Sequence, residues 1–196
     1  MQNQLILASS SPRRIQLLRE CNISFKAIKH SFNEDLIKNK NPVKLTKLLA
    51  YNKALSIAKK SEYNKMYVLG VDTLVVIKNK ILGKPLNKEE AKNFILMLSN
   101  KTHRVISGIS IINIEKSIYL TRKSISWVKF MKINEKFIKY YLDNNLWEGY
   151  AGGYAIQESI FNLIVKKIKG SYSNIVGLPV NVLYSMLKDI NYNFVW

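Results

Sequence analysis

Three long runs of mostly apolar and β-branched residues constrain the fold more than any other feature of the sequence. They cover residues 66–77, 102–114 and 118–130, and each is typical of a long β-strand. A turn at Lys78-Asn79 would bring Ile81-Leu82 back along the first run as a hairpin. The second and third runs are expected to pair antiparallel. The chain is therefore built around a sheet.

Segments with helical spacing of apolar residues separate these runs, and shorter strands accompany them. We expect a first helix of about eight residues after the N-cap Ser11. Four further helices are expected over 42–60, 87–99, 134–142 and 179–188. Short strands are expected at 5–8, 25–28 and near 161–168. No repeat, linker or change of composition marks a boundary, so we predict one α/β domain with a mixed sheet over residues 1–196.

Apolar stretches and cysteine content predict a cytoplasmic protein. The longest apolar-leaning stretches run about ten residues, whereas a bilayer-spanning helix needs roughly twenty. The N-terminal residues lack the pattern of a signal peptide. A single cysteine, Cys21, cannot form an internal disulfide, and no Cys or His cluster has zinc-ligand spacing. We therefore expect no membrane association.

The formal net charge of +18 suggests a polyanionic partner, and a nucleic-acid-binding protein is one alternative. However, only five of the 31 basic residues are arginine. The lysines are spread along the chain instead of gathering with aromatic residues that could stack on bases. We favour a solvated lysine-rich surface and expect no specific nucleic-acid partner, although a positive field would attract a nucleotide.

Residues 9–14, Ser-Ser-Ser-Pro-Arg-Arg, lie where the first strand ends and a helix begins. The free amides of a helix N-terminus and the forked guanidinium groups of Arg13 and Arg14 suit phosphate oxygens. The alternative is a capped helix whose two arginines face solvent. The Gly-Lys-Ser core of a Walker loop is missing.

Asp72 lies inside an otherwise apolar strand, where a carboxylate is costly to bury unless it is paired or binds a cation. It could hold Mg2+ or accept a proton from water, although a carboxylate satisfied by backbone amides is the alternative. Gln157, in the Gly-rich stretch 151–157, could read a base edge, and the loop 170–179 could cradle an anion. The isolated His30 and His103 are interpreted as structural or surface residues.

In this order, the segments resemble the Maf family of nucleotide pyrophosphatases from Leu5 to about Leu187. The resemblance rests on residues 7–14 with Leu17-Leu18, and on 72–73, 82–85, 151–157 and 170–179. It implies an elongated mixed sheet with flanking helices and two lobes around a cleft, similar to the inosine triphosphatase class. It also implies a homodimer in which water attacks the α-phosphorus of a nucleoside triphosphate and releases pyrophosphate, with Mg2+ or Mn2+ as cofactor.

The family's residue roles can be carried over to matching positions of this chain. Asp72 matches the proton acceptor, and Glu34 matches the acidic residue after the second strand that helps hold metal or water; the resemblance thus implies a metal held by Asp72 and Glu34. The other matches are Lys53 and Lys84 for the lysines facing the phosphates, Ser9 and Arg14 for the phosphate end, and Arg13, Thr73 and Gln157 for substrate choice.

Substrate preference and biological role are less constrained by the resemblance. Thr73 with Gln157 resembles the branch that prefers dTTP and UTP, and the 7-methyl-GTP branch is the alternative. The chain departs from the commonest pattern at Val71, Tyr150 and Glu158, on the base-recognition side. House-cleaning of nucleotides is an implied role. A regulatory protein of septation or division arrest that keeps the fold is a further alternative.

Overall fold

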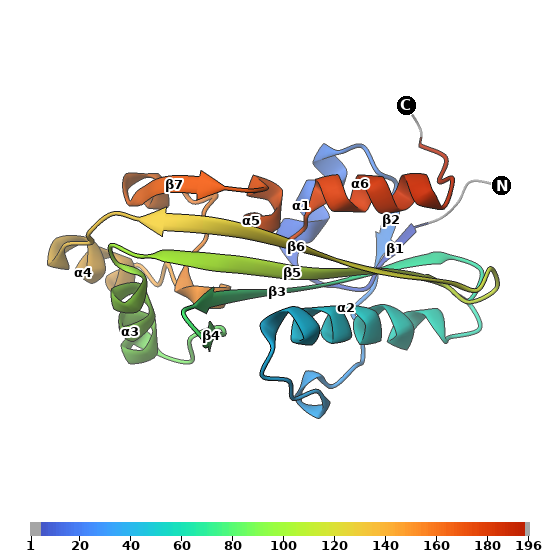
Figure 1. Ribbon diagram of the computed structural model, residues 1–196, viewed down its shortest axis with the longest axis horizontal. Coiled ribbons are helices and arrows are strands. Elements are labelled where there is room, and N and C mark those ends of the chain that lie inside the picture. The colour runs from blue at the N-terminus through green and yellow to red at the C-terminus, as the bar shows by residue number, and fades with distance from the viewer. Residues whose placement is uncertain (1–4, 195–196) are drawn as a thin grey trace. The chain divides into compact units, whose positions relative to one another are not determined.

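The computed structural model describes residues 5–194, whose contacts divide the chain into two compact units (Figure 1). Unit 1 contains the chain up to Asp72, residues 107–124 and the chain from Gly177 on. Unit 2 contains residues 73–106 and 125–176. The chain passes between the units within each of its three long strands, β3 (Tyr67–Ile77), β5 (Thr102–Asn113) and β6 (Ile118–Phe130), and once more between Val176 and Gly177.

The strands form one mixed sheet with the order β2-β1-β3-β5-β6-β7, and β4 pairs with β3 outside this path. The short strands β1 (Leu5–Leu7) and β2 (Phe25–Ala27) are parallel to each other, and β1 is also parallel to β3. Antiparallel pairs join β3 to β4 (Lys80–Leu82) and β6 to β7 (Val165–Lys169). The predicted mixed α/β sheet and its hairpin after β3 are confirmed.

In unit 1 the strands are covered by helices on both faces. Figure 1 shows α2 (Pro42–Ala58) on one face, and α1 (Pro12–Glu20) with α6 (Val180–Asp189) on the other. Side chains alternate along a strand, so Leu5 and Leu7 join the core beneath α1 and α6. Ile6 and Ala8 join the core beneath α2. The first strand therefore anchors both layers.

Helix α2 lies unusually close to the sheet because two glycines face it. A Cβ atom on Gly70 would lie 2.1 Å from the carbonyl oxygen of Ala50, and one on Gly108 would lie 2.2 Å from that of Thr46. Helix backbone thus packs directly on strand backbone. Asp72 lies two residues after Gly70 and points to the same face of β3, while Lys53 lies three residues after Ala50 on the same side of α2.

Unit 2 packs its helices around an aromatic core. Helix α3 (Lys88–Leu98) contacts α4 (Glu135–Asp143) and the short turn η2 (Ala151–Gly153). The Tyr154 ring contacts the rings of His103, Phe130 and Phe161 in edge-on or tilted geometry. His103 is buried, and its Nε2 atom lies 2.7 Å from the hydroxyl oxygen of Tyr154. The interpretation of His103 as a structural residue is confirmed.

Two local expectations were wrong. No strand begins at Phe161, which lies instead in the 3-10 helix η3 (Ser159–Leu163) because its ring packs among Phe137, Tyr141 and Tyr154; β7 starts only at Val165. The loop 170–179 contains a short helix, α5 (Tyr172–Val176). The predicted N-cap position of α1 at Ser11 is confirmed, although the Ser11 side chain makes no capping hydrogen bond.

Among residues 5–194, no helix has the length and apolar character that a membrane crossing requires. The remaining predicted helices are present with bounds close to those expected. The N-caps Asn87 of α3 and Asn134 of α4 each accept a backbone N–H of their own first turn, from Glu90 and Phe137.

Replacing Gly70 by alanine is expected to lower the free energy of unfolding by about 3 kcal/mol, because the new methyl group would overlap the Ala50 carbonyl oxygen of a rigid helix. Urea denaturation measures the change. Gly83→Ala is the matched control, since no atom lies within 4 Å of the added Cβ. Equal urea midpoints for the two variants would contradict the close packing of α2.

His103 is expected to make the protein less stable in acid. Burial lowers the pKa of His103 from 6.5 to about 3. Below pH 6.5 the unfolded chain therefore binds a proton that the folded protein does not, and stability falls until pH 3. Each pH unit costs about 1.4 kcal/mol. His103→Gln should flatten the fall measured by denaturation between pH 6.5 and 4, and parallel curves would contradict it.

Candidate functional site

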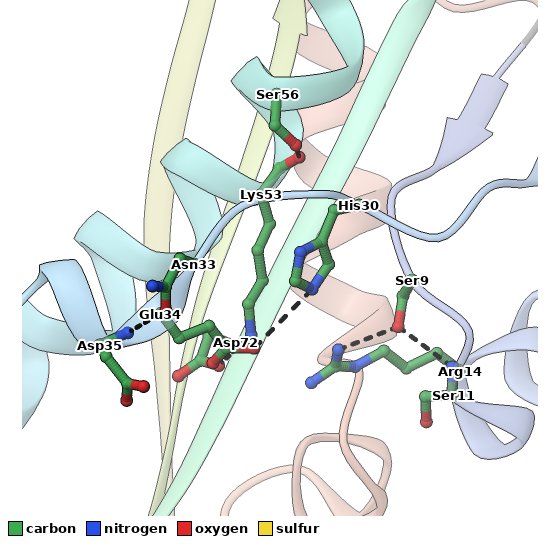
Figure 2. Close-up of polar contacts among 10 residues, drawn as sticks. All are labelled: Ser9, Ser11, Arg14, His30, Asn33, Glu34, Asp35, Lys53, Ser56 and Asp72. Carbon is green, nitrogen blue, oxygen red and sulfur yellow. Dashed lines mark hydrogen bonds and ion pairs between the residues drawn. The ribbon is translucent and has the colours of Figure 1, made fainter.

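Lys53, Asp72 and Glu34 form a charged cluster in unit 1 (Figure 2). The Lys53 ammonium nitrogen donates to Asp72 Oδ1 at 2.7 Å and lies 2.9 Å from Glu34 Oε2. Lys53 comes from α2 and Asp72 from β3, and the two residues are only 5% and 6% exposed. Glu34 belongs to the 3-10 helix η1 (Glu34–Leu36), and its side chain is 47% exposed. One buried ammonium thus links two carboxylates.

The second oxygen of Asp72, Oδ2, is buried and has no hydrogen-bond partner. An unpaired carboxylate oxygen is costly in a protein interior, so its presence points to a partner supplied from outside the chain. No group of three or more His, Cys, Asp or Glu residues that could hold a metal occurs among residues 5–194. Asp72 and Glu34 nevertheless fit Mg2+, which often binds one or two carboxylates and takes its other ligands from water and substrate phosphates.

A second set of contacts lies where β1 meets α1. Arg14 donates from Nε to the Gly177 carbonyl at 3.0 Å and from Nη1 to the Ser9 hydroxyl at 3.2 Å. The same hydroxyl accepts the backbone N–H of Ser11 at 3.2 Å, and Figure 2 shows Ser9 between these two donors. Ser9, not Ser11, therefore organises the first turn of the helix and fixes the guanidinium group.

The two sets of contacts influence each other electrostatically. Burial lowers the pKa of Arg14, the negative charge of Asp72 acts against this, and the adjacent Arg13 lowers the pKa further. Because a guanidinium group keeps its proton in proteins, Arg14 is a cation that lies in the field of the carboxylates. Cations on one side and carboxylates on the other suit a phosphate chain that arrives with a metal ion.

His30 belongs to this site, although the sequence suggested only a structural or surface residue. Its Nε2 atom lies 3.7 Å from Glu34 Oε1, the oxygen that does not face Lys53, and its side chain is 18% exposed. Burial lowers the pKa of His30, and the positive charge of Lys53 lowers it further. The negative charge of Glu34 acts against this lowering of the His30 pKa. Only the four-residue spacing to Glu34 could have indicated this contact in the sequence.

The structure gives the element and the exposure of each of the other predicted site residues. Arg13 follows Pro12 in α1, and Thr73 follows Asp72 in β3; both are half-buried. Lys84, in the loop after β4, is exposed, and Gln157 is half-buried. Both belong to unit 2, and their roles stay predictions.

Two of the sequence motifs meet within unit 2. The backbone N–H of Gly152 donates to the Gly83 carbonyl at 2.8 Å. A positive φ of 71° at Gly152, where an added Cβ would lie 2.9 Å from the Val75 side chain, explains the need for glycine. The loop that carries Lys84 is therefore tied to the segment that leads to Gln157.

The family model and the relatives that match this chain agree with each other. The family model described as Maf-like protein matches residues 4–190. The dTTP/UTP pyrophosphatase of Ruminiclostridium cellulolyticum is 41% identical over 188 residues, which cover 95% of this chain and 96% of that protein. The enzyme of the same name from Clostridioides difficile is 41% identical over 184 residues, covering 94% and 93%.

One solved structure is a weaker match. The crystal structure of a nucleoside-triphosphatase / dITP/XTP pyrophosphatase from Mycobacterium abscessus has a TM-score of 0.44 and 10% identity. The match covers 66% of this chain and 75% of that one.

Proposed function

Because this chain belongs to the Maf-like protein family, we propose that it hydrolyses nucleoside triphosphates to the monophosphate and pyrophosphate, with dTTP and UTP as preferred substrates. The observation that carries this proposal is the buried Lys53 ammonium between two carboxylates, one of which keeps a free oxygen. Relatives at 41% identity carry the name dTTP/UTP pyrophosphatase, which favours the pyrimidine substrates over 7-methyl-GTP.

In the proposed reaction Asp72 accepts a proton from the attacking water. Its Oδ1 is held by Lys53, so the carboxylate cannot rotate freely, and Oδ2 remains as the available acceptor. A water that donates to Oδ2 would be oriented by a carboxylate fixed on a rigid strand. Such positioning, with general-base assistance, is what hydrolysis of a phosphoanhydride requires.

We propose that Asp72 and Glu34 hold Mg2+ or Mn2+. Such a cation, when bound, neutralises phosphate charge and lowers the pKa of a coordinated water. Carboxylates such as those of Asp72 and the half-exposed Glu34 are the oxygen ligands that Mg2+ prefers, which supports this assignment.

Ser9 and Arg14 are proposed to bind the phosphates. The guanidinium group is fixed by the Gly177 carbonyl and the Ser9 hydroxyl, so a phosphate would meet a preorganised cation. Arg14 lies in the first turn of the nine-residue helix α1, whose first amides add positive potential. Lys84 is proposed to face the phosphates as well, whereas Arg13, Thr73 and Gln157 are proposed to select the base.

We further propose a cytoplasmic homodimer in which residues 1–196 work as one domain. Nucleotide house-cleaning is the role that the activity suggests. The 7-methyl-GTP branch, a basic nucleic-acid-binding protein and a division-arrest regulator remain the alternatives. Salt-sensitive DNA binding without hydrolysis would favour the second of these.

Pyrophosphate release is expected with dTTP and UTP, and more slowly with CTP, ITP or 7-methyl-GTP, when Mg2+ or Mn2+ is present. A coupled pyrophosphate assay on this set of nucleotides with each metal measures the preference. Fastest turnover of 7-methyl-GTP would reassign the chain to the other branch. No release from any of the five would rule out the proposed activity.

Asp72→Asn is expected to lower kcat by at least about a thousandfold, because an amide cannot accept the proton of the attacking water. Circular dichroism should show an intact fold. Asp143→Asn, an exposed aspartate at the end of α4, is the matched control and should keep the wild-type rate. Wild-type turnover by Asp72→Asn would show that another group accepts the proton.

A further inference from the structure

The Lys53 ammonium lies between the two carboxylates that are proposed to hold the metal, 2.7 Å from Asp72 Oδ1 and 2.9 Å from Glu34 Oε2. We propose that Lys53 is a positioning residue that acts as a resident cation. It holds Asp72 and Glu34 together in the metal-free protein, and a divalent cation must take over part of its role in order to bind. This inference rests on the proposed function.

Charge balance explains why such a cation is needed. Asp72 is 6% exposed, and a second carboxylate close by would repel it in a medium that screens poorly. One ammonium offsets this repulsion, and the cluster keeps a single net negative charge. Lys53, at 5% exposure, likewise depends on the carboxylates for the interactions that water would otherwise provide.

The two carboxylates are not held equally, which indicates where exchange occurs. Asp72 is buried on the long strand β3, and its Oδ1 atom is the nearer of the two carboxylate oxygens to the Lys53 nitrogen. Glu34 lies on a three-residue 3-10 helix, and its side chain is 47% exposed. Glu34 can therefore turn away from Lys53 at low cost, while Asp72 keeps its pair with the lysine. Asp72, which stays in place on β3, supplies the second carboxylate for an incoming cation.

Competition between ammonium and metal follows from this arrangement. A divalent cation held by both carboxylates meets a site in which one of the two negative charges is already neutralised. The wild-type protein alone should therefore bind Mg2+ or Mn2+ weakly, and the negative charge of a triphosphate would be needed for tight binding. Lys53 in this way couples metal binding to the arrival of substrate.

Removing the Lys53 ammonium is expected to strengthen metal binding and to destabilise the metal-free protein. Lys53→Met should bind Mn2+ at least about tenfold more tightly than the wild type in calorimetric titration without nucleotide, because the full charge of two carboxylates is then available. Its melting temperature should be below the wild-type value in EDTA and recover with Mn2+. Lys44→Met, an exposed lysine of α2, is the control for loss of one positive charge and should match the wild type.

Equal or weaker Mn2+ binding by Lys53→Met would overturn the inference. If this variant is unfolded in EDTA, recovery of its circular dichroism signal on adding Mn2+ supports the inference, and failure to recover overturns it. In the double variant Lys53→Met with Glu34→Gln, the gain in affinity should be lost, and its persistence would contradict the role of Glu34. Pyrophosphate release by the wild type, measured on the same preparation, tests the proposed function separately.

Discussion

The pair between buried Lys53 and buried Asp72 is the interaction on which the rest of the site depends. Neither charge can be left alone in the interior, because an uncompensated buried charge costs several kcal/mol, roughly 3 to 5 when one partner of such a pair is removed. Helix α2 must therefore lie close enough to β3 for the ammonium to reach the carboxylate. Gly70 and Gly108 permit that approach, since a side chain at either would collide with the helix backbone.

The same constraint arranges the other groups around it. Glu34 is brought to the cluster by its pair with Lys53, and His30 accompanies it from the preceding loop. On the other side, Ser9 at the end of β1 fixes Arg14 within the field of Asp72. Strand β1 pairs directly with β3 in a register that matches Leu7 with Leu69, so Ser9 and Asp72 follow neighbouring ends of this pair. Fixed charges of both signs can stabilise the charge that develops when a phosphoanhydride is hydrolysed.

The sequence could predict most of the elements and mark Asp72 as a candidate, because periodicity indicates helices and strands and a carboxylate is unusual in an apolar strand. It could not mark Lys53 among 26 lysines, or Glu34 in a loop, without the family resemblance, because their meeting depends on how α2 is placed against the sheet. His30 was missed for the same reason. The error at Phe161 arose because packing against other aromatic rings outweighed its preference for a strand.

The short helix α5 shows a further limit of local reasoning. Asn174 within it is fully buried and donates to the Val105 carbonyl and the Ser126 hydroxyl. Five residues seldom form a helix by their own propensity, so these distant contacts stabilise it. Neither contact can be read from the polar sequence of the loop 170–179, which suggested an anion cradle.

The central claim is that water attacks the α-phosphorus of a nucleoside triphosphate. Hydrolysis of dTTP in water labelled with oxygen-18, followed by mass spectrometry of the products, tests it most directly. We expect one labelled oxygen in the thymidine monophosphate and none in the pyrophosphate. Label in pyrophosphate, or release of labelled orthophosphate with thymidine diphosphate, would contradict the account.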